Sequence, residues 1–321
     1  MDSAKICMHP SHHSANFVAF QGSLGVQPQV ERTLRAIIAF VLLLLLQVSG
    51  TEAQQKRNRS SEGGASKDVI RDCPNCPEMV VVPAGEFMMG SPQSERGRNP
   101  DEGPQRKVVF AQPFAVGRHE VTFAQWDACV AENGCTHKPD DNTWGRARRP
   151  VINVSWNDAK QYVAWLAKKT GKPYRLLTEA EWEYAARGTT KATAAQPPFS
   201  TGPTINISQA NYDGNFIYGV GARPGIYRQK TMDVGSFKPN AFGVYDMHGN
   251  VWEWVEDCYK DSYAGAPTDG SAVTARDCTL NILRGGAWNY YPQLLRSAYR
   301  YASAPGVRTE NAGFRVARSM P

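Results

Sequence analysis

The chain has 321 residues, of which 41% are apolar and 21% charged, and its formal net charge is +6. This composition is typical of a globular protein and excludes a largely disordered chain or a bundle of membrane spans. Apart from the stretch 146–149 the basic residues are dispersed, whereas a nucleic-acid-binding face needs a clustered basic patch. We therefore expect no nucleic-acid partner.

The N-terminal region carries an apolar, leucine-rich run from Ala36 to Val48, preceded by Arg32 and Arg35 and followed by small residues. This order is typical of a secretory signal peptide. The run is shorter than the roughly 20 apolar residues that cross a bilayer, so a permanent membrane anchor is the weaker alternative. We expect a polar, flexible tether next, and then an exported domain that is periplasmic or secreted. The predicted boundaries are 1–53 for the signal peptide, 54–72 for the tether and 73–319 for the domain.

Six cysteines follow the predicted signal peptide. An even number in an exported chain predicts disulfides. Zinc or redox chemistry is the alternative for Cys73-x-x-Cys76, but neither a second ligand pair nor a thioredoxin-like βαβ pattern accompanies it. Because the cysteines form three sequence-local pairs, we expect the bridges Cys73–Cys76, Cys129–Cys135 and Cys258–Cys278.

Short β segments are predicted in the first part of the domain. Residues 79–82 form an apolar run that Pro83-Ala-Gly85 turns, and 86–90 would be its partner strand. The stretch 91–106 is rich in Ser, Gly, Pro and charge, which favours a loop. Residues 107–116 are predicted to be another β segment.

Three capping boxes predict three helices, because each hydroxyl can accept from the helix start while the later polar side chain reaches back. Gly171 and Gly188 would end the second and third helices, and 174–177 should be a short strand between them. After Gly188 the chain is dominated by Gly, Pro, Asn and Tyr, which predicts irregular loops with short strands. The boxes are Thr122-x-x-Gln125, Ser155-x-x-Asp158 and Thr178-x-x-Glu181.

Four segments, in order, resemble the formylglycine-generating enzyme (sulfatase-modifying factor) family over about residues 73 to 319. The resemblance implies a single, loop-rich α+β domain with C-type-lectin-like topology, a few short strands and about three short helices. It also implies an oxidase that converts a sulfatase cysteine to formylglycine, using oxygen and a copper ion held by two cysteine thiolates. The segments are Met79 to Ser91, Arg175 to Arg187, Asn240 to Trp254, and Arg284-Gly-Gly-Ala-Trp288 followed by Gly313-Phe-Arg315.

The copper-binding cysteines of the family are missing. The resemblance places them at Tyr290 and Leu295, and no cysteine follows Cys278. Copper(I) is selected by soft thiolate ligands, which neither residue supplies. We therefore expect no copper site and no catalytic residue at these positions. Cys258 and Cys278 could in principle substitute, but we favour a bridge that closes the loop between them.

A calcium site is implied by the third segment. The family holds the ion with two side chains and two main-chain carbonyls, which correspond here to Asp246, Gly249, Val251 and Glu253. Ca²⁺ is a hard cation that takes six to eight oxygen ligands, and an ion would make a loop-rich domain more rigid. The alternative is that both acids bind arginine or backbone amides.

The last part of the chain clusters aromatic residues and arginine, with Trp288, Tyr290, Tyr291 and Arg300 as ligand-facing candidates. Aromatic and arginine side chains dominate binding hot spots, although packed rings in a loop-rich core are the alternative. We expect Trp288 in the core and the two tyrosines at the surface.

The sequence favours a non-oxidase binding or accessory module for a protein, peptide or small-molecule ligand. The alternatives are formylglycine formation in the same cleft and a different modification of a peptide or small molecule.

Overall fold

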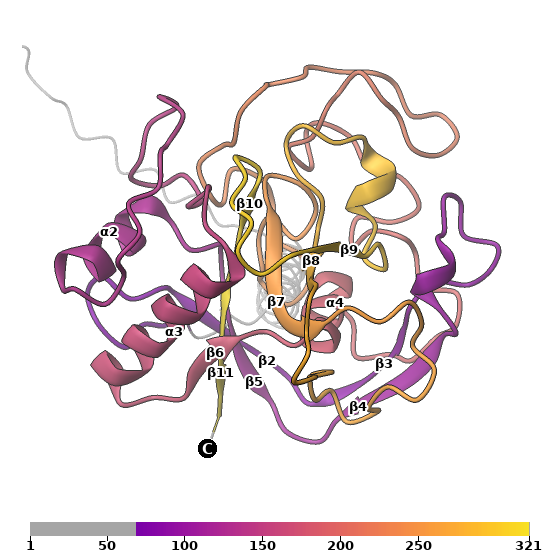
Figure 1. Ribbon diagram of the computed structural model, residues 1–321. Helices are drawn as coiled ribbons and strands as arrows, with labels where there is room; N and C mark the ends of the chain where they lie inside the picture. The colour runs from indigo at the N-terminus through magenta and orange to yellow at the C-terminus, as the bar shows by residue number, and fades with distance from the viewer. Residues whose placement is uncertain (1–68, 321) are drawn as a thin grey trace, which may run out of the picture. The chain divides into compact units, whose positions relative to one another are not determined.

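The computed structural model describes residues 69–320 and contains three α-helices with several short sheets (Figure 1). The predicted signal peptide and most of the predicted tether lie outside the described residues. Among the described residues, no helix combines the length and apolarity needed to cross a bilayer. The helices are α2 (Phe123–Ala131), α3 (Trp156–Thr170) and α4 (Glu179–Arg187), with the 3₁₀ turns η1 (Pro100–Glu102) and η2 (Pro292–Leu295).

The strands form one five-stranded sheet, one four-stranded sheet and one two-stranded ribbon. The largest sheet has the order β1-β2-β5-β11-β6 and is antiparallel throughout. Its strands are β1 (Val69–Ile70), β2 (Met79–Val82), β5 (Phe114–Gly117), β6 (Tyr174–Leu176) and β11 (Val316–Ser319). The others are the ribbon β3 (Gly85–Met89) with β4 (Arg106–Phe110), and the sheet β10 (Ala312–Gly313), β7 (Trp252–Cys258), β8 (Asn281–Arg284) and β9 (Tyr301–Ser303).

All three predicted helices are confirmed, each with its capping box. The Thr122 hydroxyl accepts from the Gln125 amide at 3.3 Å, and the Gln125 side chain accepts from the Thr122 amide at 3.0 Å. Ser155 and Thr178 begin α3 and α4 in the same way. Gly171 and Gly188 end these helices with left-handed backbone, at φ 66° and 62°, where glycine has no Cβ to strain.

Two strand predictions are wrong in their pairing. The segment 86–90 is not the partner of β2, because β1 and β5 occupy both edges of β2, and β3 pairs with β4 instead. The segment 107–116 is not one strand. It divides before Pro113, which lacks an amide hydrogen for a ladder bond, into β4 of the ribbon and β5 of the large sheet.

Four residues of the predicted tether, 69–72, fall within the described structure. Val69 and Ile70 pair with Val80 and Met79 as β1. Asp72 accepts hydrogen bonds from Tyr174 at 2.6 Å and from Arg318 at 2.8 Å. This part of the predicted tether therefore belongs to the folded domain.

The hydrophobic core has two large clusters. One joins α2 and α3 to the sheets and includes Trp126, Tyr162 and Phe314. The other lies around α4 and the ribbon and includes Phe87 and Tyr184. The six cysteines that the structure describes form the three sequence-local bridges, Cys73–Cys76, Cys129–Cys135 and Cys258–Cys278.

Candidate functional site

The motif Arg284-Gly-Gly-Ala-Trp288 forms the end of β8 and the turn that follows it. Gly285 and Gly286 have positive φ, 95° and 75°. A Cβ on Gly286 would lie 2.5 Å from the Leu295 side chain, and one on Gly285 would lie 3.0 Å from Trp182. Glycine is therefore required at both positions, by backbone conformation and by the close approach of neighbours. The chain that leaves this turn carries Trp288, Tyr290 and Tyr291.

Tyr290 and Tyr291 form an aromatic surface together with neighbouring rings. The half-buried Tyr290 ring lies edge-on to Trp252, with centroids 5.5 Å apart. Tyr291 is 42% exposed, and its ring centroid lies 5.7 Å from that of Phe216. Tyr301 stacks on Trp252 at 5.2 Å. This group of rings is large, rigid and partly exposed, which suits contact with an aromatic or apolar ligand.

Trp288 is buried, as expected for a core residue. Its indole contacts Trp144 edge-on at 5.1 Å, and its Nε1 donates to the Glu310 carbonyl at 3.3 Å. Trp288 therefore packs in the core beneath the surface and offers little exposed area to a ligand.

Arg300 does not lie with the tyrosines at the exposed surface. It is buried, and its guanidinium donates to the Glu179 carboxylate at 2.7 and 3.1 Å. It also donates to the main-chain carbonyls of Asp101 and Lys260. All three guanidinium nitrogens of Arg300 donate hydrogen bonds within the protein, so this side chain has a structural role. Arg300 also lines a separate pocket together with Asp257 and Tyr263.

The position that the family resemblance assigns to the second cysteine is closed to solvent. Leu295 is fully buried in an apolar cluster with Phe199, Ile205 and Tyr218. Its carbonyl is held by His248, whose Nδ1 lies 2.8 Å away. Burial lowers the pKa of His248 to about 4, so this imidazole is a neutral hydrogen-bonding group at neutral pH.

Three of the four predicted calcium residues are buried and Asp246 is half-buried, and one of the four, Glu253, pairs with Arg315. The guanidinium of Arg315 donates to both oxygens of Glu253, at 2.6 and 2.7 Å, and the Trp182 indole donates to one of them at 2.7 Å. Asp246 accepts from the Gly235 amide at 2.7 Å. These are the arginine and amide partners that the alternative interpretation expected. Val251 is buried, and the Gly249 amide donates to the Gly285 carbonyl.

A third carboxylate, which the sequence analysis missed, completes this region. Glu120 is buried, accepts from Asn250 at 3.0 Å with one oxygen, and has no partner for the other among the described residues. Burial and the Asp246 charge raise the pKa of Glu120, and burial raises the pKa of Asp246 to about 6. A proton shared with Asp246, or a cation, would satisfy this oxygen, whereas Glu253 is already paired with Arg315. No three acidic, histidine or cysteine side chains of residues 69–320 converge as a ready metal site, and calcium stays a prediction.

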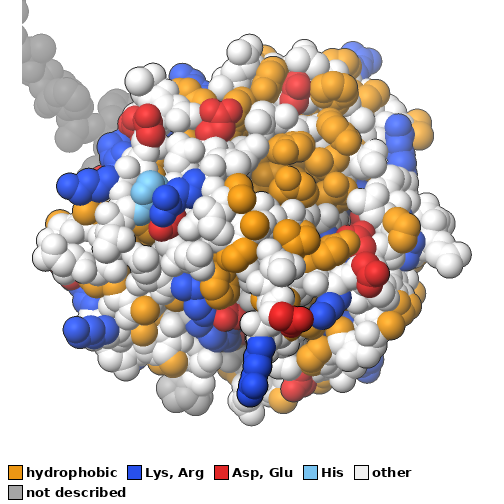
Figure 2. All heavy atoms as spheres, in the orientation of Figure 1, with side chains coloured by type: hydrophobic (Ala, Val, Ile, Leu, Met, Phe, Trp, Pro, Cys, Tyr) orange, Lys and Arg blue, Asp and Glu red, His pale blue; other side chains and the backbone are white. Residues whose placement is uncertain are grey.

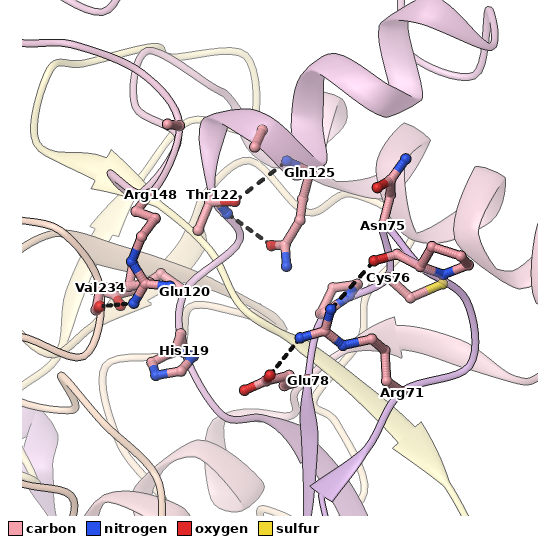
Figure 3. Close-up of a pocket in the computed structure, with 14 residues that line it drawn as sticks. Arg71, Asn75, Cys76, Glu78, His119, Glu120, Thr122, Gln125, Arg148 and Val234 are labelled. Atoms are coloured by element: carbon pink, nitrogen blue, oxygen red, sulfur yellow. Dashed lines mark hydrogen bonds and ion pairs between the residues drawn. The ribbon is translucent and has the colours of Figure 1, made fainter.

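Glu120 also lines a pocket of about 260 Å³ beside the start of α2 (Figure 3). Figure 3 shows Arg148 near His119 and Glu120, with Arg71 and Glu78 on another part of the wall. Burial and the Arg315 and Arg118 charges lower the pKa of His119 to about 4. The signal in the sequence was an acid two residues before the Thr122 capping box.

Comparisons with known proteins identify the family of this chain. A model of the sulfatase-modifying factor enzyme 1-like domain family matches residues 65–320. Formylglycine-generating enzyme from Streptomyces coelicolor is 36% identical over 74% of this chain and 88% of its own length. Inactive C-alpha-formylglycine-generating enzyme 2 from Bos taurus is 30% identical over 74% and 87%.

The likeness extends to kinase-named proteins and to a solved structure. Serine/threonine-protein kinase pkn1 from Chlamydia pneumoniae is 32% identical over 80% of this chain. The match covers only 40% of the length of that relative. The structure of PvdO from Pseudomonas aeruginosa is 45% identical, with a TM-score of 0.68, over 79% of this chain and 98% of that one. The loop-rich α+β fold that the family resemblance implied is thereby confirmed. The chain belongs to the formylglycine-generating enzyme family, as a sulfatase-modifying factor enzyme 1-like domain.

Proposed function

We propose that this chain is a non-oxidase member of its family, a binding or accessory module that presents Tyr290 and Tyr291 to a protein, peptide or small-molecule ligand. The observation that carries the proposal is the burial of Leu295 in an apolar cluster, where the family keeps a copper-binding cysteine. Every cysteine among residues 69–320 is in a disulfide, so the described domain supplies no thiolate.

Tyr290 is a poor substitute for the other cysteine. Burial raises the pKa of its phenol, so the group stays protonated at neutral pH and offers no anionic oxygen. A neutral phenol oxygen is also a harder ligand than the thiolates that select copper(I). A relative whose name calls it inactive shows that the family includes members without the reaction, which supports the proposal.

The decisive test is formylglycine formation. The purified chain is incubated with copper, oxygen and a Cys-x-Pro-x-Arg peptide, next to an active formylglycine-generating enzyme as positive control. We expect no aldehyde by mass spectrometry from this chain. Aldehyde formation would show that the chain is an oxidase after all, and tightly bound copper in the purified protein would argue the same.

We also propose that the protein is exported and works in the periplasm or outside the cell. The support is the N-terminal pattern of the sequence together with three disulfides, which form and persist in oxidising compartments. Edman sequencing of protein recovered from the extracytoplasmic fraction tests this. A mature terminus near residue 54 is expected, and recovery only from the cytoplasm would contradict export.

Calcium at Asp246, Gly249, Val251 and Glu253 is the remaining proposal. Its support is the Glu120 oxygen that lacks a hydrogen-bond donor, next to the half-buried Asp246 and the buried Glu253. A ligand at about 100 times its Kd stabilises the folded state by about 2.7 kcal/mol, so chelation should lower the melting temperature. The Asp246→Ala variant should no longer respond to chelator. A melting temperature that is unchanged by chelator in the unsubstituted protein would rule the site out.

A further inference from the structure

The most exposed large apolar side chains of the described residues lie in one segment, 214–232. Val220 is 97% exposed, Ile226 65% and Phe216 51%. Exposed apolar side chains gathered in this way mark a protein-interaction or membrane-interaction site. Figure 2 shows hydrophobic side chains on the upper right part of the face drawn, where Figure 1 shows the loops between α4 and β7 together with η2 and the chain that leads to β9.

The backbone of the segment holds these side chains outward. Gly219 and Gly221 have positive φ, 90° and 79°, on either side of Val220. The Gly225 amide donates to the Gly214 carbonyl at 2.6 Å, which closes the base of the loop. The loop is also attached to the domain beneath it, because the Asp213 amide donates to the Tyr290 carbonyl at 3.0 Å. The apolar tip is therefore displayed by a closed loop.

The charges of the segment all have one sign. It contains Arg223, Arg228 and Lys230, and no acid lies between Asp213 and Asp233. Arg228 donates to the Ile207 carbonyl. Arg223 and Lys230 are exposed, and their side chains form no hydrogen bond or ion pair with any residue that the structure describes.

We propose that segment 214–232 docks on an anionic lipid surface, with Phe216, Val220 and Ile226 inserted between lipids and Arg223 and Lys230 at the headgroups. Apolar side chains beside cations are the combination that binds such surfaces. Self-association through this segment would bring like charges together across a symmetric contact, which disfavours a second copy. Phe216 also contacts Tyr291 of the proposed ligand surface, so the test uses Val220, Arg223 and Lys230, which are not part of that surface as described above.

A fluorophore at the tip of the loop tests the proposal in the full chain. An environment-sensitive label is attached at Val220→Cys in a Cys7→Ser background, with Lys172→Cys as a matched label on an exposed residue of another region. We expect the label at position 220 to brighten and shift to shorter wavelength when vesicles of phosphatidylcholine with phosphatidylglycerol are added. Phosphatidylcholine vesicles alone should have little effect, and the label at position 172 should not respond.

Three outcomes overturn the proposal. They are no response at position 220, an equal response at position 172 from general adsorption of the chain, and a response that follows protein concentration without vesicles, as self-association would give. The electrostatic part is tested by Arg223→Gln and Lys230→Gln in the labelled chain. Each change should weaken partitioning about fivefold, since a cation near an anionic surface contributes about 1 kcal/mol. Unchanged partitioning in the double variant, with its melting curve intact, would contradict a role for charge.

Discussion

Two regions of the domain are stabilised in different ways. The region 122–188 carries the three α-helices, and each begins with a local capping box. The region 281–319 has short strands and loops, and it contributes five buried arginines that pair with carboxylates far away in the sequence. These pairs are Arg284 with Glu179 and Glu183, Arg296 with Glu95 and Glu102, Arg300 with Glu179, Arg315 with Glu253, and Arg318 with Asp72.

The difference shows where the information for each region lies. A capping box is complete within four residues, so the helix start is encoded locally. A buried arginine is stable only if its carboxylate and carbonyl partners arrive from elsewhere in the fold. The two regions should therefore respond differently to single substitutions.

The largest effect is expected from Arg284, whose side chain is fully buried. Its guanidinium donates to Glu183 at 2.6 Å, to Glu179 at 3.1 Å and to two main-chain carbonyls. Arg284→Met would leave the Ala298 and Ser297 carbonyls without this donor, and would leave each of the two buried carboxylates with one arginine instead of two. Breaking a buried pair costs about 3–5 kcal/mol. Denaturant unfolding should show a loss of this size.

A matched control for this substitution is Lys107→Met, which removes the exposed ion pair with Glu86. Exposed pairs contribute about 0–1 kcal/mol, so this variant should unfold close to the unsubstituted protein. Equal losses for the two variants would contradict the claim that burial makes the Arg284 pairs important for stability.

The bridge Cys258–Cys278 should have the next largest effect, because it closes the long irregular loop between β7 and β8. The cysteines are 20 residues apart, and loop-closure entropy assigns such a bridge about 3 kcal/mol. The Cys258→Ser/Cys278→Ser variant should lose about this much. The Cys73→Ser/Cys76→Ser variant, whose loop is much shorter, should lose about 2 kcal/mol. Equal losses in denaturant unfolding would argue against the loop-closure explanation.

Asp257, in β7, should give the domain a pH dependence, and its carboxylate accepts from the Glu179 amide at the start of α4. It is buried, and burial together with the Glu179 charge raises its pKa to about 7. The unfolded chain therefore loses this proton at lower pH than the folded one, and stability should fall as pH rises from about 4 to about 7. The slope from one such group is at most about 1.4 kcal/mol per pH unit. Urea unfolding of Asp257→Asn across this range should show a smaller slope, and an unchanged slope would assign the dependence to other groups.

The helices could be predicted because their signals are short-range. Thr122, Ser155 and Thr178 each satisfy their helix start with a side chain three residues away, and glycine ends two of the helices. The strand pairing of 86–90 could not be predicted, because a β pattern sets which residues alternate but not which edge they join. The choice depended on β1 and β5 occupying both edges of β2.

Some residues of the candidate site could be predicted from local motifs, whereas others depend on partners that are distant in sequence. The positions of Tyr290 and Leu295 followed from a motif, and the exposure of Tyr291 agreed with the expected surface. Arg300 was expected at that surface because arginine is common in binding sites, but the nearby Glu179 carboxylate holds it in the interior. Glu120 was missed because its significance depends on Asp246, which is distant in sequence and close in space.

The smallest effect is expected from the helix caps, and it completes the comparison between the two regions. Thr122→Ala removes the hydroxyl that accepts from the Gln125 amide and should cost about 1 kcal/mol. Thr122→Ser keeps the acceptor and should retain most of the stability. Denaturant unfolding should therefore order the variants as Thr122→Ser, Thr122→Ala and Arg284→Met, from most to least stable. If Thr122→Ala were as destabilising as Arg284→Met, the helical region would not be locally encoded. The Thr122 hydroxyl would then stabilise contacts well beyond its own helix.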